Sequence, residues 1–214
     1  MISASVIIIQ GDSMHFTSDI LIIGAGITGC SVARELSRFQ ADIMVIDRGS
    51  DIAEGATKAN SGIVHAGFDA VPGSRKAYYN VAGAGLFPAL CEELGVPYRQ
   101  AGALVIALGE ADLFTLKDLL ERGRKNGVEG LRILSREEAL ALEPQLNPKI
   151  RGALLAPTSG LVSPYELAFA LADDAALNGV RFRFEEQVTE AETAEGGFRV
   201  FTSENEYRCR VLIN

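Results

Sequence analysis

The sequence contains no tryptophan and, among its 214 residues, only three cysteines and two histidines. Cys30, Cys91 and Cys209 are widely spaced, and none belongs to a Cys-x-x-Cys pair. This spacing argues against a disulfide framework and against a zinc site. We therefore expect no metal, and we expect the cysteines to be small buried residues.

Long apolar runs are also absent. The longest nearly apolar stretch, residues 20–33, is interrupted by glycines and by Thr28 and Ser31, and it is shorter than the roughly 20 residues that cross a bilayer. Residues 6–9 are apolar, but no basic residue precedes them and no cleavage site follows, so no signal peptide is expected. These features predict a cytoplasmic protein without a transmembrane segment, and they leave peripheral membrane association open.

Positive charge is in deficit, with 20 Lys and Arg against 28 Asp and Glu and a net charge of −8. This charge argues against nucleic acid as a partner, because the field of the protein repels polyphosphate. Hydrophobic residues make up 48% of the chain and charged residues 22%. Such a composition is typical of a folded protein and not of a disordered one.

A β-α-β unit is predicted at residues 20–47. Residues 20–23 are a continuous aliphatic run, as in a parallel strand that is buried on both faces. Ile27, Cys30, Ala33 and Leu36 then recur at helical spacing, as on a helix that ends near residue 38. A second apolar strand, residues 43–46, ends in Asp47 and completes the unit.

The turn between the first strand and the helix has the Gly-x-Gly-x-x-Gly pattern. Gly24 permits the tight turn, Gly26 lets a diphosphate approach the backbone, and Gly29 lets helix and strand pack closely. Asp47 would accept hydrogen bonds from ribose hydroxyls. The pattern predicts a dinucleotide site for NAD, NADP or FAD. Asp47 disfavours a 2′-phosphate, but Arg48 keeps NADP open. A glycine turn without a ligand is the less favoured alternative.

Further elements follow from periodicity and capping patterns. Residues 49–76 form a long irregular stretch of the kind that is often functional. Capping boxes at Ser135 and Ser163, each followed three residues later by glutamate, predict helix starts. The other expected elements are helices at 75–94 and 111–125, strands at 103–106 and 180–184, an antiparallel meander over 198–202 and 207–213, and a buried strand at 211–214.

Four stretches resemble the D-amino-acid oxidase-like superfamily of FAD-dependent oxidoreductases, and within it the glycerol-3-phosphate dehydrogenase and L-2-hydroxyglutarate oxidase proteins. They are the glycine turn with Asp47, residues 55–67 (GATKANSGIVHAG), residues 142–144 (LEP) and residues 160–164 (GLVSP). The resemblance covers most of residues 18–214. It implies FAD as the cofactor, because the 55–67 pattern is more specific than the glycine turn.

The resemblance also implies further site residues. It places Thr57, Asn60, Ser61 and Gly62 under the pyrophosphate and along the flavin ring; the alternative is a solvated surface loop. It places the backbone of Val188 against the adenine, where the alternative is a plain sheet residue.

His65 is a candidate catalytic base. The resemblance puts a histidine of this segment near flavin and substrate, and imidazole titrates near neutrality, as a base for alcohol oxidation should. A packed histidine that is hydrogen-bonded to the backbone is the alternative.

Together these features predict an α/β fold: a Rossmann-like FAD-binding domain with a parallel sheet and a β-meander, plus the beginning of an α+β substrate domain. The expected division is an N-terminal extension at 1–17, of which 1–13 is dispensable, an FAD-binding domain at 18–96 and 161–214, and a partial substrate domain at 97–160. The resemblance implies that the family's second half is missing, which leaves open whether this chain alone is active and retains FAD.

The expected function is hydride transfer to flavin N5 from glycerol 3-phosphate or a small 2-hydroxy acid. The expected partners are this small anionic substrate and a redox partner, which is a quinone, oxygen or a protein. The oligomeric state is left open. The alternatives are an NAD-linked dehydrogenase and a non-catalytic nucleotide-binding module.

Overall fold

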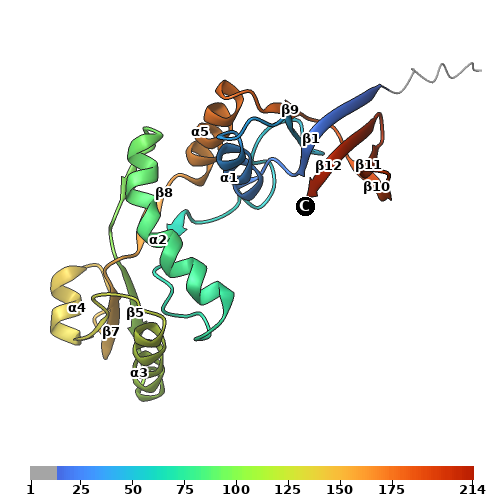
Figure 1. The fold of residues 1–214 in the computed structure, drawn as a ribbon. Helices are drawn as coiled ribbons and strands as arrows, with labels where there is room; N and C mark the ends of the chain where they lie inside the picture. Colours follow the sequence, from blue (N-terminus) through green and yellow to red (C-terminus); the bar gives the residue numbers. More distant parts are fainter. Residues whose placement is uncertain (1–13) are drawn as a thin grey trace, which may run out of the picture. The chain divides into compact units, whose positions relative to one another are not determined.

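The computed structural model describes residues 14–214, so the expectations for residues 1–13 lie outside it (Figure 1). The chain divides into two compact units. The first unit comprises the described residues up to Ala59 together with Ala168–Asn214, and the second comprises Asn60–Leu167. The boundary therefore falls inside one helix, α5.

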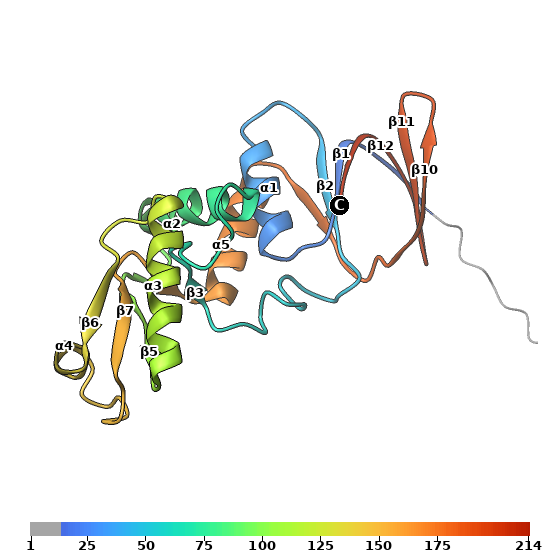
Figure 2. The ribbon, with the colours of Figure 1, turned by 90° about the horizontal axis from the view of Figure 1, so that it is seen from below.

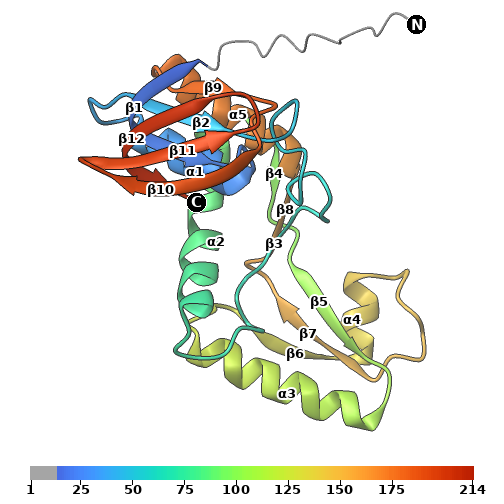
Figure 3. The same ribbon diagram turned by 90° about the vertical axis from the view of Figure 1, so that its right-hand side faces the viewer.

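The first unit contains one sheet and helices α1 and α5. Its elements are β1 (His15–Ile23), α1 (Ile27–Leu36), β2 (Ile43–Ile46), α5 (Pro164–Leu177, from Ala168 on), β9 (Arg181–Arg183), β10 (Val188–Ala194), β11 (Gly197–Thr202) and β12 (Glu206–Ile213). The six strands have the order β10-β11-β12-β1-β2-β9. Strands β12, β1, β2 and β9 run parallel, whereas β10, β11 and β12 form an antiparallel meander (Figure 3).

Alternate side chains of the central strands enter two separate cores. Ile22, Ile43 and Val45 pack with residues of α1 and α5, including Ala33 and Ala175. On the other face of these strands, buried residues pack with the meander: Leu21, Met44, Ile46, Val200, Tyr207 and Cys209. All four residues of β2 are buried. A strand that is covered on both faces needs such a continuous apolar run, which is why the sequence pattern located it.

The second unit contains two small sheets and three helices that lie wholly within it. Its elements are β3 (Ile63–Val64), α2 (Arg75–Glu93), β4 (Tyr98–Arg99), β5 (Ala103–Ala107), α3 (Glu110–Lys125), β6 (Arg132–Ser135), α4 (Arg136–Leu142), β7 (Gly152–Ala156) and β8 (Gly160–Val162). The sheets have the orders β3-β8-β4 and β5-β7-β6, and all their pairs are antiparallel.

Central strand β7 carries the core of the second unit on both of its faces. Leu154 and Ala156 pack with Leu116 of α3, whereas Ala153 packs with Ala139 of α4. Figure 2 shows α3 lying along β5, β6 and β7. The predicted helix at 111–125 is confirmed, and its leucine stripe packs against this core.

The expected α/β class with a parallel sheet and a meander is confirmed, with two corrections. The first strand begins earlier than predicted, so His15, Phe16 and Thr17 belong to the sheet and not to an extension. They pair with β12 and Phe16 stacks on Tyr207, a contact that periodicity within 15–18 does not reveal. The end of β12 is not fully buried: Val211 is 47% exposed, because β11 pairs with β12 only as far as Cys209.

Candidate dinucleotide-binding site

The glycine turn joins β1 to α1, and two of its glycines meet steric requirements. Gly24 has φ +107°, in the left-handed region that favours glycine. At Gly29, an added Cβ atom would collide with the carbonyl oxygen of Gly24. The first turn of α1 can therefore approach the end of β1 only because both positions lack side chains.

Some backbone amides around the start of α1 donate hydrogen bonds within the protein, and others have no acceptor. Ala25 N–H donates to Asp47 Oδ2 at 2.6 Å, and Ile27 N–H donates to Thr57 Oγ1 at 3.0 Å. Within residues 14–214, the amides of Gly26 and Thr28 have no hydrogen-bond acceptor. The first turn of α1 also carries no acidic residue. The positive end of the helix dipole is thus available to an anion such as a diphosphate.

An open cleft of about 970 Å³ lies beside this turn, within the first unit. Ligands of open α/β sheets bind outside the carboxyl ends of the strands, and the ends of β1, β2 and β12 all contribute to this cleft. Its lining residues are Ile23, Gly24, Gly26, Asp47, Arg48, Gly49, Glu54, Gly55, Ala56, Thr57, Glu186, Gln187, Val188, Ala191, Leu212 and Asn214.

Asp47 has a structural role beyond the one that its position predicts. Its Oδ2 accepts from Ala25 N–H, and its Oδ1 accepts from Gly49 N–H at 2.7 Å. A carboxylate offers about four lone-pair sites, so Asp47 keeps the capacity to accept ribose hydroxyls. The side chain of Arg48 is exposed in the wall of the same cleft.

Glu186 is a wall residue that sequence patterns did not indicate. It is 3% exposed and is hydrogen-bonded on both carboxylate oxygens. Burial alone would raise the pKa of Glu186, but hydrogen bonds from four side chains together lower it; these are Thr202, Tyr207, Asn205 and Arg183. No local motif could have indicated this residue, because three of these partners lie on or beside other strands.

The predicted site residues are divided between the units. The structure brings Gly24, Gly26, Asp47, Arg48, Thr57 and Val188 together around the cleft, with Gly29 packed against Gly24. Asn60, Ser61, Gly62 and His65 belong to the second unit.

The loop of the second unit that holds these four residues has defined local geometry. Asn60 Oδ1 accepts from Gly62 N–H at 2.8 Å, and Gly62 has φ +66°. A Cβ atom at Gly62 would collide with the carbonyl oxygen of Val162, whose amide donates to Gly62 O at 3.0 Å. Glycine is therefore required where the loop meets β8. His65 follows β3 with an exposed side chain, so it is accessible to a reactant.

The thiol of Cys30 is buried beside the glycine turn and is not expected to be reactive. Cys30 Sγ donates to the carbonyl oxygen of Ala25 at 3.4 Å, and burial is the main cause that raises its pKa to about 12. All three cysteines are buried and free of disulfide bonds, as the sequence analysis expected. Since the thiolate is the reactive form, Cys30 acts as a packing residue.

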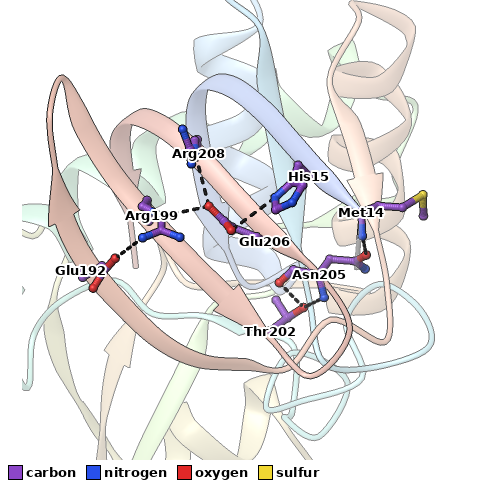
Figure 4. A network of polar contacts seen from close by, with 8 residues as sticks. All are labelled: Met14, His15, Glu192, Arg199, Thr202, Asn205, Glu206 and Arg208. Atoms are coloured by element: carbon purple, nitrogen blue, oxygen red, sulfur yellow. Dashed lines mark hydrogen bonds and ion pairs between the residues drawn. The ribbon is translucent and has the colours of Figure 1, made fainter. Parts of the chain in front are cut away.

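A second buried carboxylate, Glu206 on β12, is absent from the lining of the cleft. Glu206 accepts from Arg199 Nε at 2.9 Å and from Arg208 Nε at 3.2 Å, and His15 Nδ1 lies 3.3 Å away (Figure 4). The hydrogen bond from Arg199 is the main cause that lowers the pKa of Glu206 to about 2. This network ties β12 to β11 and β1.

Comparison with known proteins identifies the class. Residues 19–214 match the DAO family of FAD dependent oxidoreductases, and the chain belongs to this family. The expected cofactor, FAD, is the cofactor of the family.

Individual relatives are more specific. The chain is 41% identical over 196 residues to the glycerol 3-phosphate dehydrogenase of Caloramator mitchellensis. This match covers 92% of this chain and 41% of that protein. It is 36% identical over 155 residues to the mitochondrial L-2-hydroxyglutarate dehydrogenase of Arabidopsis thaliana, over 72% of this chain and 32% of that one. The chain therefore spans less than half the length of these relatives.

A solved structure supports the fold. The L-alpha-glycerophosphate oxidase of Mycoplasma pneumoniae, reduced with dithionite and with FAD bound, superimposes with a TM-score of 0.86 at 30% identity. The match covers 92% of this chain and 53% of that one. None of the helices in residues 14–214 has the length and apolar character needed to cross a bilayer.

Proposed function

We propose that the cleft of the first unit binds the ADP part of FAD, and that the first unit is thus the core of an FAD-binding domain. The observation that carries the proposal is one cleft of about 970 Å³ that is lined both by Asp47 and by Gly26, whose amide has no acceptor among the described residues. The amide of Thr28, in the first turn of α1, is open in the same sense. We assign the diphosphate to the amide of Gly26 and the adenosine to the part of the cleft that Asp47 and Val188 line.

The chain's own residues suit defined parts of the cofactor. Gly26 gives the diphosphate access to the backbone, and Thr57 fixes the amide of Ile27 beside it. Asp47 is the acceptor for ribose hydroxyls, and Arg48 lies exposed beside it. Asn60, Ser61 and Gly62 are assigned to the flavin ring, because small and polar side chains permit close approach and hydrogen bonding.

We further propose that the substrate is glycerol 3-phosphate or a small 2-hydroxy acid such as L-2-hydroxyglutarate. The glycerol 3-phosphate dehydrogenase and the L-2-hydroxyglutarate dehydrogenase compared above are 41% and 36% identical to this chain. When bound, FAD supplies a two-electron acceptor at N5 for the hydride that leaves the hydroxyl-bearing carbon. His65 accepts the hydroxyl proton, so that the alcohol becomes a carbonyl. Turnover would then require an electron acceptor, which we propose to be a quinone, oxygen or another protein.

Anaerobic reduction tests this proposal. The purified chain, reconstituted with FAD, is mixed in turn with glycerol 3-phosphate, L-2-hydroxyglutarate and glycerol as an uncharged control. We expect either anionic compound to bleach the flavin band near ~450 nm, while glycerol does not. Bound flavin that neither compound reduces would contradict the catalytic role of this chain. Binding of NAD without FAD would favour the NAD-linked dehydrogenase instead.

A further inference from the structure

The linker between β9 and β10, residues 184–187, forms part of the cleft wall through Glu186 and Gln187. Its backbone is tied to the end of β2. Glu186 N–H donates to Asp47 O at 2.8 Å, and Glu185 N–H donates to Gly49 O at 2.7 Å. The linker is therefore attached to the same segment that supplies the ribose-binding carboxylate.

The conformation of this linker needs support. Glu185 has φ +61°, a left-handed conformation that is unfavourable for a residue with a side chain. Such a conformation persists only where surrounding contacts over-determine it. The hydrogen bond from Glu185 N–H to Gly49 O is one such contact, and the others come from Glu186, the next residue along the chain.

The buried carboxylate of Glu186 supplies this support through side-chain hydrogen bonds to a different segment of the chain. Glu186 Oε2 accepts from Thr202 Oγ1 at 2.6 Å, and Oε1 accepts from Asn205 Nδ2 at 2.6 Å. Arg183 Nη2 lies 3.2 Å from Oε1 and supplies the compensating charge. Thr202 and Asn205 border the turn between β11 and β12. The side chain thus joins the linker to that turn, while the backbone joins it to β2.

Val188, which begins β10, directly follows this clamped segment. The Gln187 carbonyl accepts from Ser203 N–H at 3.1 Å, which again fixes the wall to the β11–β12 turn. We propose that Glu186 is a positioning residue for nucleotide binding: it holds the Gln187–Val188 wall at the distance from Asp47 that an adenosine group requires. This inference rests on the proposed function of the cleft, and it adds a residue that does not itself contact the nucleotide.

Glu206 provides a matched control. It is also a buried glutamate of the meander region and also accepts hydrogen bonds from arginines, but it does not line the cleft. A loss of stability alone should affect both networks alike. A positioning role predicts that only the alanine variant of Glu186 loses ADP affinity, because only Glu186 belongs to the cleft wall.

The test uses ADP, which carries the adenosine and diphosphate groups without the flavin. The dissociation constant of ADP is measured by calorimetry for the wild type, Glu186→Ala, Glu186→Gln and Glu206→Ala, and each melting temperature is recorded. We expect Glu186→Ala to weaken ADP binding by at least about tenfold, as is usual when a supporting contact of a site is lost. Glu186→Gln, which keeps the shape and most hydrogen bonds, should retain most of the affinity.

The outcomes separate the two proposals. Glu206→Ala should lower the melting temperature and leave the ADP affinity within about twofold of the wild type. Unchanged ADP affinity in Glu186→Ala, or an equal loss in both alanine variants, would overturn the positioning role. If Glu186→Ala does not fold, Thr202→Val is measured in its place, because it removes the hydrogen bond to Glu186 Oε2 and Thr202 does not line the cleft. An ADP affinity of Thr202→Val equal to that of the wild type would then overturn the positioning role. A wild type that binds neither ADP nor FAD would instead overturn the proposed function.

Discussion

The backbone of the glycine turn depends on the absence of particular side chains. At Gly29, the obstacle to a Cβ atom is the Gly24 carbonyl oxygen, a backbone atom that cannot move without shifting the turn. At Gly26, the nearest atom to an added Cβ is Thr57 Oγ1 at 3.1 Å, so even a methyl group would press on the hydroxyl that holds Ile27. Different physical reasons thus exclude side chains at the two positions.

A pair of glycine substitutions tests this difference between positions. We expect Gly29→Ala to lower the free energy of unfolding by about 1 to 3 kcal/mol, because the added methyl forces the turn and helix apart. Gly85→Ala, in the middle of α2 with no atom within 4 Å of the added Cβ, should raise it by about 0.5 to 1 kcal/mol. Urea denaturation measures both. Equal midpoints for Gly29→Ala and the wild type would contradict the packing argument.

The two histidines of the chain allow a controlled test of the proposed base. His65→Gln should slow reduction of bound flavin by substrate by about 10² to 10⁴-fold, the usual contribution of a general base. His15→Gln should leave the rate unchanged, because His15 lies on β1 beside Glu206 and outside the cleft lining. Anaerobic stopped-flow measurements compare the two variants. An unchanged rate in His65→Gln would show that His65 is not the base.

At the scale of elements, local patterns located most helices and strands because each carries its own signal. The stripe of α3 and the apolar run of β2 are complete within the segments themselves. The beginning of β1 carries no such signal, since His15–Thr17 join the sheet through pairing with β12, far along the chain. The two-residue strand β3 is likewise defined by its partner β8. Non-local pairing is what the sequence pattern could not supply.

The capping box of α4 permits a prediction at this scale. Glu138 N–H donates to Ser135 Oγ at 3.2 Å, and Ser135 N–H donates to Glu138 Oε2 at 2.8 Å. Ser135→Ala should lower the free energy of unfolding by about 1 kcal/mol, because a helix amide loses its acceptor. Ser135→Thr, which keeps the hydroxyl, should lose much less. Denaturant titrations of both variants check this, and identical losses would show that the hydroxyl is not the cause.

At the scale of the whole molecule, some residues of the cleft can be predicted from the sequence and others cannot. The sequence predicts the residues of the glycine turn and of the end of β2, because a short motif contains them. It does not predict Glu186, because the environment of Glu186 is assembled from β9 and from the turn between β11 and β12. Positions contained in one motif can be predicted locally, whereas walls formed by several segments require the fold.

The stability of the first unit's sheet at low pH should depend on Glu206, because its pKa differs between the folded and the unfolded chain. The pKa of Glu206 is lowered from 4.5 to about 2 in the folded protein, mainly by Arg199. A lowered pKa means that the folded state favours the charged form. The stabilisation is therefore complete above about pH 5 and is lost as the pH falls toward 2.

Glu206→Gln removes this titration. Melting temperatures measured between pH 6 and pH 2.5 should fall less steeply in the variant than in the wild type, with the two curves converging at low pH. Glu137→Gln is the control: Glu137 is an exposed residue of α4 that makes a surface ion pair with Arg136 at 3.7 Å, and this variant should follow the wild-type curve closely, because surface ion pairs contribute little. Parallel curves for Glu206→Gln and the wild type would show that the Arg199 network does not contribute.

The most direct test of the account is FAD binding by the chain itself. Flavin fluorescence is followed as the chain is titrated into FAD, for the wild type and for Gly26→Leu, with Gly85→Ala as the folded control. We predict saturable binding of a single FAD per chain by the wild type and the control, and none by Gly26→Leu. Absence of saturable binding in the wild type, or equal affinity in Gly26→Leu, would contradict the assignment of the cleft.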